Sequence, residues 1–459
     1  MPPSADLVVL GAGPAGLAAA RRAARAGLSV TVLDRAESVG GMAASFDVAG
    51  VRVDHGSHRL HPATPPAVIA DIRQLLGDDL QVRPRHGRLR IGDRWVGFPL
   101  RAAELVRALP PRMVAGAALD TVTGPFRRAH EDSYAGALRR SLGPTLYGAL
   151  YAPYAKKLWG SDGAEIDAEQ ARKRVSADTP LKIARRILFR HGNGQGRIFY
   201  YPRRGFGQIT EALAEAATAA GADLRLGADV RRVAGATVTT ADGAEFSGGH
   251  LFTTVPLPVL ARLHQPAPPP DAVEAAGRLR FRAMVLAYAV HEGRPWTEFD
   301  AHYLPGPDTP ITRISEPANY RDSPDDPADR TVLCCELPCE VGDAVWTASE
   351  DELAAIITGT LARLGLPPLR LGGVQVKRLP HVYPVYARGY ADHLRGLDAW
   401  AGTLPDVTTF GRLGLFVHDN THHAMVMAYD AVDALRDGRR DEPAWADARA
   451  RFAGHVVED

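Results

Sequence analysis

The N-terminal stretch ADLVVLGAGPAGLAAARRAARAGLSVTVLDR, residues 5–35, constrains the fold more than any other part of the chain. The short apolar run Leu7–Leu10 is typical of a parallel strand that is buried on both faces. An alanine- and arginine-rich stretch up to Gly27 predicts a helix, and Ser29–Leu33 predicts a second strand. The order of strand, helix and strand indicates a Rossmann-like α/β unit.

The turn between the first strand and the helix carries Gly11, Gly13 and Gly16 at G-x-G-x-x-G spacing. The first glycine permits the tight turn, the second lets the backbone approach a pyrophosphate, and the third lets the helix pack on the strand. Asp34 ends the second strand, where a carboxylate accepts hydrogen bonds from ribose hydroxyls and disfavours the 2′-phosphate of NADP. A glycine-rich loop that binds no ligand is the alternative. It is the weaker one, because strand, turn, helix, strand and acid all occur in the expected order.

The stretch DHGSHRLHPA, residues 54–63, holds three histidines, an aspartate and an arginine. A metal site, a catalytic cluster and a polar structural loop are all compatible with this composition. No helical spacing places the histidines on one face, so a metal is the weakest of the three interpretations and none is expected elsewhere.

Composition excludes several classes of protein. Hydrophobic residues make up 46% of the 459 residues, and 54 Lys and Arg balance 53 Asp and Glu, so no net field favours nucleic acid or an anionic membrane. No apolar run reaches the ~20 residues of a membrane-spanning helix, and the N-terminus does not resemble a signal peptide. We expect a cytoplasmic protein in which Cys334, Cys335 and Cys339 are buried free thiols.

Two further segments resemble the glutathione-reductase type of FAD-binding fold. ESVGGMAASF places Gly40, Gly41 and Ser45 after the acid, like the second flavin fingerprint, although Met42 stands where an arginine is usual. The strand around Val230 resembles the one that contacts adenine, and the following HLFTTVP resembles a strand that returns to the sheet. FAD is therefore the expected cofactor.

Motifs along the rest of the chain resemble the superfamily of amine oxidases, protoporphyrinogen oxidases and UDP-galactopyranose mutases, most closely its mutase-like branch. The matching segments are DHGSHRLHP, RWVGFPL, LYGALYAPYAKKLWG with Tyr147, Tyr154, Lys157, Trp159 and Gly160, FYYPRRGFGQI, ITRISEP with Arg313, and FGRLG with Gly411, Arg412 and Gly414. The resemblance covers almost the whole chain. It implies an α/β fold in which a Rossmann-like FAD domain carries an inserted α+β substrate domain.

The resemblance also implies domain boundaries and site residues. Residues 1–60, 200–260 and 400–440 would form the FAD domain, 60–200 and 260–400 the substrate domain with a helical region, and 440–459 a C-terminal tail. It implies cofactor contacts from Gly11, Gly13, Gly16, Asp34, Gly40, Gly41, Ser45, Val230, Gly411 and Arg412, substrate contacts from Tyr154, Lys157, Trp159, Arg174 and Arg313, and catalytic roles for His58, His61 and Arg313. His418 is a further catalytic candidate, as a histidine expected near the flavin.

Near the C-terminus the chain departs from the mutase pattern, since LFVHDNTHHAM replaces a tyrosine-rich stretch and an acid. Histidines near a flavin suit proton removal coupled to hydride transfer, so His418, His422 and His423 are candidate bases. We therefore expect an FAD-dependent oxidoreductase that takes a hydride from a sugar, glycoside or amine-bearing metabolite. A non-redox nucleotide-sugar mutase and an idle flavin-binding subunit are the alternatives.

The basic stretch KIARRILFRHGNGQGR, residues 182–197, favours a solvated helix and loop over a membrane-surface helix, and it is also a candidate lid over the substrate. The expected partner is a small-molecule substrate and not a nucleic acid. The oligomeric state is open, with a homodimer as one option.

Overall fold

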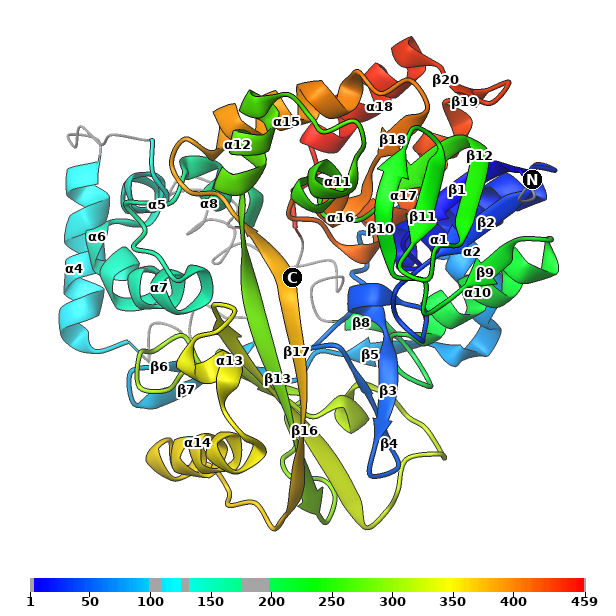
Figure 1. The fold of residues 1–459 in the computed structure, drawn as a ribbon. Coiled ribbons are helices and arrows are strands. Elements are labelled where there is room, and N and C mark those ends of the chain that lie inside the picture. The colour runs from blue at the N-terminus through cyan, green and yellow to red at the C-terminus, as the bar shows by residue number, and fades with distance from the viewer. Residues whose placement is uncertain (1–3, 99–108, 125–131, 175–197, 458–459) are drawn as a thin grey trace.

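The computed structural model describes residues 4–98, 109–124, 132–174 and 198–457. A seven-stranded sheet contains the N-terminal strand and has the order β10-β11-β12-β1-β2-β9, with β18 beside β12 (Figure 1). Strands β1, β2, β9, β12 and β18 pair in parallel, whereas β10 and β11 are antiparallel. The bounds are β1 Ser4–Leu10, β2 Val30–Leu33, β9 Asp223–Arg225, β10 Val230–Ala234, β11 Thr237–Thr240, β12 Glu245–Thr253 and β18 Val407–Thr409.

Both faces of this sheet are covered, which explains the unbroken apolar run of its first strand. Leu7 and Val9 belong to the core on one face, and Val8 and Leu10 to the core on the other. The first face packs against α1 (Pro14–Arg25), α10 (Gln208–Ala219) and α17 (Thr421–Asp433), and the second against α11 (Leu257–Leu263), α12 (Pro270–Arg278) and α15 (Tyr390–Gly402). The predicted Rossmann-like architecture is confirmed.

A second seven-stranded sheet has the order β17-β13-β16-β15-β14-β6-β7 and is antiparallel except between β14 and β6. Its bounds are β6 Gly87–Ile91, β7 Arg94–Phe98, β13 Arg280–Glu292, β14 Ala301–Tyr303, β15 Arg313–Ser315, β16 Arg330–Cys339 and β17 Leu371–Val385. Cys334, Cys335 and Cys339 lie on β16, buried and free, as predicted. Helix α14 (Glu350–Arg363) covers one face.

A helical group lies beside this sheet, at the left of Figure 1. It has a core of its own, which includes Tyr134, Leu138, Leu158 and Trp159. Its elements are α4 Pro111–Thr123, α5 Tyr134–Leu142, α6 Pro144–Leu146, a π-helical turn Tyr147–Tyr151, α7 Ala152–Trp159 and α8 Ala168–Arg174. Together with the second sheet it confirms the predicted α+β part of the fold.

The remaining elements connect these units. They include three sheets of two strands, β3 (Ser45–Val48) with β4 (Val51–Asp54), β5 (Leu80–Pro84) with β8 (Ile198–Pro202) and β19 (Leu435–Arg436) with β20 (Arg439–Arg440). The helices are α2 Pro66–Leu76, α13 Ala344–Thr347, α16 Gly411–Gly414 and α18 Glu442–Ala453, with short 3-10 turns at Gly41–Ala43, Gly77–Asp79 and Pro317–Tyr320. Helix α18 lies within the stretch expected to be a tail and packs Trp445 and Phe452 into the main core. The division into domains stays a prediction.

Two of the sequence predictions concern residues that the structure does not describe. The basic stretch 182–197 and the end of RWVGFPL, residues 99–100, lie outside them. Among the helices that are described, none is long and apolar enough to cross a membrane.

Candidate active site

The glycine turn has the geometry that a dinucleotide phosphate requires. Gly11 has a φ of +108°, and its N–H donates to the Leu33 carbonyl at 2.8 Å. A Cβ on Gly16 would overlap the Gly11 carbonyl oxygen, whereas the nearest atom to a Cβ on Gly13 would be 3.9 Å away. Gly13 is also the N-cap of α1, which has no side-chain cap and no acidic residue in its first turn. The turn therefore leaves open space next to uncapped N–H groups, which suits a pyrophosphate.

Asp34 lies directly after β2 and faces this turn. Its carboxylate accepts hydrogen bonds from the N–H groups of Ala12 at 2.7 Å and Ala36 at 2.8 Å. The N–H of Ala228 donates to the Asp34 carbonyl at 2.8 Å, which places the start of β10, and hence Val230, close to the acid. A carboxylate oxygen has lone pairs beyond these bonds, so ribose binding by Asp34 and adenine contact by Val230 stay predictions that the geometry permits.

The second glycine pair lies against the first turn. The Gly40 N–H donates to the Ala12 carbonyl at 2.7 Å, and a Cβ on Gly41 would lie 3.4 Å from the Gly13 Cα. The Ser45 hydroxyl forms its hydrogen bonds within the protein, because it donates to Asp54 at 2.6 Å and accepts from the Gly207 N–H at 2.7 Å. The two glycine segments are thus one continuous surface, and the Ser45 side chain serves to hold it in place.

The C-terminal glycine segment closes the same region. A Cβ on Gly411, at the start of α16, would lie 3.1 Å from the Ala15 Cβ in the first turn of α1. Arg412 follows and donates to the carbonyls of Val382 at 3.0 Å and Asp419 at 3.3 Å, while its buried Nε has no hydrogen-bond partner among the described residues. An unpartnered buried donor beside the phosphate turn fits an FAD whose phosphates or ring oxygens accept from it.

The histidine-rich loop is anchored by its aspartate. Buried Asp54 accepts hydrogen bonds from Ser45, from the Tyr201 hydroxyl at 2.5 Å and from the Phe206 N–H at 2.9 Å. These bonds leave Asp54 satisfied as a structural acceptor, which argues against a metal at this loop. His55 Nδ1 lies 2.9 Å from the Gly41 carbonyl, and burial lowers the pKa of His55 to about 4.

Arg313 contacts the same loop at Ser57, next to His58. The His58 ring stacks on Phe206 with centroids 5.2 Å apart, and burial lowers its pKa, so the ring is neutral. Arg313 donates to Glu336 at 2.7 and 3.1 Å and to the Ser57 carbonyl at 3.3 Å. Glu336 also accepts from the Ser57 N–H at 2.8 Å, so one carboxylate holds both the arginine and the loop.

His61 lies in a different group of residues. The Ala63 N–H donates to His61 Nδ1 at 3.1 Å, and the Thr64 hydroxyl donates to the His61 carbonyl at 2.6 Å. His422 Nδ1 is 3.4 Å from the same hydroxyl, and burial and the neighbouring histidines lower the pKa of His422 to about 3. The structure therefore brings His61 together with the C-terminal histidines.

His418 belongs to an aromatic cluster that includes Trp159. The ring of His418 is buried beside Trp159, Tyr383 and Tyr386, at centroid distances of 5.3, 6.3 and 4.9 Å. Gln170 Nε2 lies 3.2 Å from its Nε2, and burial holds its pKa well below the usual range. A histidine so enclosed is a neutral hydrogen-bonding group at neutral pH.

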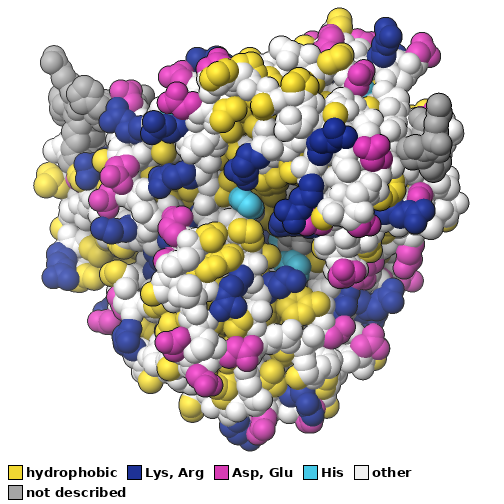
Figure 2. All heavy atoms as spheres, in the orientation of Figure 1, with side chains coloured by type: hydrophobic (Ala, Val, Ile, Leu, Met, Phe, Trp, Pro, Cys, Tyr) yellow, Lys and Arg dark blue, Asp and Glu magenta, His cyan; other side chains and the backbone are white. Residues whose placement is uncertain are grey.

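Two arginine side chains pack on the ring of Tyr383, a β17 residue of this cluster. The guanidinium groups of Arg174 and Arg412 each lie 5.2 Å from the centre of its ring, and Arg174 is also 5.5 Å from that of Trp159. Figure 2 shows a hollow in the face it draws, bordered by basic and histidine side chains. Two cations flanking one phenol suit an anionic or strongly polar ligand.

Tyr383, Gln170 and Glu336 are absent from the residues predicted from the sequence. Glu336 could have been found, because a glutamate inside the apolar run TVLCCELPC is a buried charge that needs a partner. Tyr383 and Gln170 carry no comparable local signal.

Four of the predicted substrate residues, Tyr154, Lys157, Trp159 and Arg174, lie in the helical group. Lys157 donates to the carbonyls of Leu304 at 2.6 Å and Ile311 at 3.0 Å, so its ammonium is committed to the protein. Tyr154 lies partly buried against the core of the helical group. Their contacts with a substrate stay predictions.

Lys157 should make the free energy of unfolding depend on pH. Burial lowers its pKa to about 8, from 10.5 in the unfolded chain. Between these two values the folded chain has lost a proton that the unfolded chain still holds, so stability should rise with pH in this window. We expect the difference in unfolding free energy between the wild type and Lys157→Met to shift in favour of the wild type from pH 7.5 to pH 10. Urea unfolding at several pH values measures it, and a constant difference would contradict the prediction.

Comparisons with known proteins agree with this geometry. Residues 14–424 match a family model described as flavin containing amine oxidoreductase. A protein of Mycobacterium tuberculosis named as a flavin-containing monoamine oxidase, AofH, is 30% identical over 319 residues, which cover 64% of this chain and 66% of that protein. The match thus spans slightly less than two thirds of the length of that relative.

Solved structures share the fold at low sequence identity. A reduced UDP-galactopyranose mutase superposes with a TM-score of 0.83 at 21% identity, covering 99% of this chain and all of that chain. A protein from Exiguobacterium sp. 255-15 named for protoporphyrinogen oxidase has a TM-score of 0.71 at 19% identity, covering 94% and 99%. At such identities the likeness concerns the fold alone.

Proposed function

Because the chain belongs to the family of flavin-containing amine oxidoreductases, we propose that it is an FAD-dependent oxidoreductase acting on a polar small molecule. The family confirms the superfamily resemblance and the FAD cofactor that the sequence predicts. FAD supplies a hydride acceptor at its N5 atom. The proposed substrate is a sugar, glycoside or amine-bearing metabolite.

One observation carries this proposal. The phosphate turn at Gly13, the loop at Gly41 and the helix start at Gly411 converge from three separate parts of the chain. His55, in the histidine-rich loop, contacts the second of these segments, since its Nδ1 lies 2.9 Å from the Gly41 carbonyl. A dinucleotide bound along the three glycine segments would therefore direct its far end toward His55, His58 and the cluster around Tyr383.

The protein groups at that end suit proton transfer and the binding of a polar substrate. His58 and His422 have pKa values that burial lowers, so each imidazole is neutral at neutral pH. Arg174 and Arg412 lie on Tyr383 and supply positive charge. We propose that the arginines bind the polar part of the substrate while an imidazole accepts the proton that leaves with the hydride.

A net non-redox rearrangement of a nucleotide sugar is the second candidate. The sequence lacks the C-terminal tyrosines of the mutases, but the structure places Tyr383 and Tyr386 beside His418 from a different strand and the loop that follows it. Two phenols and two arginines in one cluster are the groups that a diphosphate would need. This observation supports the mutase reaction as the second candidate. A cytoplasmic location and a homodimer also stay predictions.

An anaerobic titration distinguishes the candidates. The flavin-loaded protein is mixed with a panel of amines, glycosides and nucleotide sugars, and absorbance in the flavin bands is followed. Stoichiometric bleaching by one substrate supports the oxidoreductase. Turnover of a nucleotide sugar that requires dithionite but consumes none supports the mutase. Binding without bleaching or turnover across the panel would contradict both and leave the idle flavin-binding subunit.

His61→Ala should slow flavin reduction by about 100-fold while FAD stays bound, because a positioned proton acceptor contributes at least that much. Stopped-flow reduction with the substrate from the titration measures the effect. His393→Ala, a partly exposed histidine on α15, serves as the matched control and should reduce at the wild-type rate. Equal rates in the two variants would remove His61 from the catalytic residues.

A further inference from the structure

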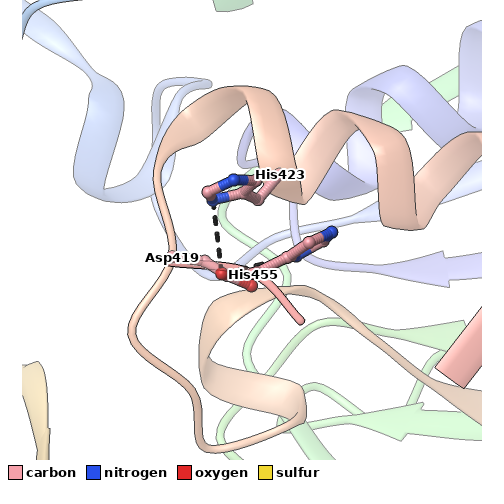
Figure 3. A group of neighbouring side chains, drawn as sticks. All are labelled: Asp419, His423 and His455. Atoms are coloured by element: carbon pink, nitrogen blue, oxygen red, sulfur yellow. Dashed lines mark ion pairs between the residues drawn. The ribbon is translucent and has the colours of Figure 1, made fainter. Parts of the chain in front are cut away.

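Asp419, His423 and His455 form a cluster that the proposed reaction does not use (Figure 3). Each offers one potential ligand atom, and the three atoms lie within 4.8 Å of one another. Asp419 precedes Asn420, the N-cap of α17, and His423 lies in the first turn of that helix. His455 follows α18. Residues from two separate helix boundaries thus bring one carboxylate and two imidazoles together, a ligand set common for divalent transition metals.

The distances fit ligands that share an ion. Asp419 Oδ1 lies 3.3 Å from His423 Nδ1 and 3.5 Å from His455 Nδ1. Ligand atoms bound to one tetrahedral zinc at about 2.1 Å are separated by about 3.4 Å. Despite this proximity, neither Asp419 oxygen and not His455 Nδ1 has a hydrogen-bond partner among the described residues. The imidazole nitrogens are therefore close enough to the carboxylate to form ion pairs without hydrogen-bond geometry, a separation that also suits ligands of one common ion.

Burial makes this arrangement costly without an ion. The Asp419 side chain is 1% exposed, and those of His423 and His455 are 11% and 15% exposed. A buried carboxylate that has only two imidazole contacts at 3.3 and 3.5 Å replaces little of the hydration it has lost. A cation at the centre of the three atoms would satisfy the carboxylate and the His455 nitrogen at once.

The surrounding contacts hold the ligands in place. The Asn420 N–H donates to His423 Nδ1 at 3.1 Å, which keeps this nitrogen deprotonated, and His423 Nε2 lies 3.2 Å from His422 Nε2. A bound ion would replace the amide hydrogen as the partner of that lone pair. The His455 ring stacks on His423 with centroids 4.2 Å apart, and Lys173 donates to the His455 carbonyl at 2.8 Å.

We propose that Asp419, His423 and His455 bind a divalent transition-metal ion of the zinc type, with water completing its coordination. The ion would fasten the segment after α18 to the loop between α16 and α17. That loop carries His418, and its Asp419 carbonyl accepts from Arg412, so the metal would act as a structural clip next to the proposed active site. It lies outside the flavin chemistry and does not depend on it.

Calorimetric titration of the flavin-loaded protein with zinc chloride tests the proposal. The protein is prepared without a histidine tag and freed of metal with a chelator. We expect one zinc ion per chain in the wild type, and none in His455→Ala or Asp419→Asn at the same concentrations. His393→Ala, outside the cluster, should bind as the wild type does. Absence of zinc binding in the wild type, or unchanged binding in His455→Ala, would overturn the proposal in favour of a protonated imidazole beside Asp419.

Thermal unfolding gives a second measurement that does not depend on calorimetry. Zinc should raise the melting temperature of the wild type and of His393→Ala, because an ion that binds the folded state stabilises it by mass action. The same concentration should leave His455→Ala unshifted. His455 lies after the last helix, so this variant is expected to fold, and its flavin spectrum checks that it has done so. An equal rise in all three proteins would show that zinc binds elsewhere.

Discussion

Gly13→Val should abolish FAD binding while leaving the folded chain intact, with an affinity loss of more than about 100-fold, or ~2.7 kcal/mol. The side chain would enter the space beside the uncapped first turn of α1, where a phosphate needs to approach the backbone. Gly13 has a φ of −83° in the extended region, so valine introduces no backbone strain. The nearest protein atom would be 3.9 Å from the new Cβ, so the loss should come from the excluded ligand.

Flavin absorbance after saturation with FAD and gel filtration measures the effect, and thermal unfolding of the flavin-free proteins checks the fold. Gly277→Val is the matched control, because Gly277 lies exposed on α12 with no atom within 4 Å of a Cβ. Gly16→Ala provides the opposite case, since its Cβ would overlap the Gly11 carbonyl and should destabilise the flavin-free fold as well. Full FAD occupancy in Gly13→Val would refute the assignment of this turn to the pyrophosphate.

The nucleotide-binding part of the fold is predictable because its determinants are local. Glycine is required at 11 by a positive φ and at 16 by close contact with Gly11, and glycine at 13 leaves room for a phosphate. The apolar run before them is required by a strand covered on both faces. The strand around Val230 and the helix start at Gly411 have similarly local patterns. Each pattern fixes a short segment, and the family resemblance supplies their order in the sheet.

The active-site partners are less predictable because they depend on contacts between distant segments. Contact between Arg412 and the pyrophosphate stays a prediction, because its two terminal nitrogens donate to backbone carbonyls and its guanidinium packs on Tyr383, which leaves Nε for a cofactor oxygen. The three histidines of residues 54–63 are neighbours in sequence, but His55 contacts Gly41, His58 stacks on Phe206 and His61 lies near His422. Sequence shows which polar residues are available, and only packing decides which of them meet.

Glu336→Ala should destabilise the protein by about 3–5 kcal/mol, because it breaks a buried ion pair and leaves one charge uncompensated. The Glu336 side chain is 6% exposed and that of Arg313 is 22% exposed. The same substitution removes the acceptor of the Ser57 N–H, so the loop that carries His58 loses its anchor. Urea unfolding measures the stability. Asp392→Ala is the control, because its ion pair with Arg395 lies on the surface, with side chains 77% and 75% exposed, and should contribute at most about 1 kcal/mol.

The conservative variant separates charge from hydrogen bonding at Glu336. Glu336→Gln keeps a carbonyl oxygen that can accept from Ser57 and Arg313, so it should retain more stability than Glu336→Ala. The double variant Arg313→Met with Glu336→Leu removes both charges and should recover part of the stability, since apolar replacement of a whole buried pair is often tolerated. It should not recover flavin reduction if Arg313 binds the substrate. Recovery of both properties would mean that the pair stabilises the fold alone, and that the cations needed by the substrate are Arg174 and Arg412 next to Tyr383.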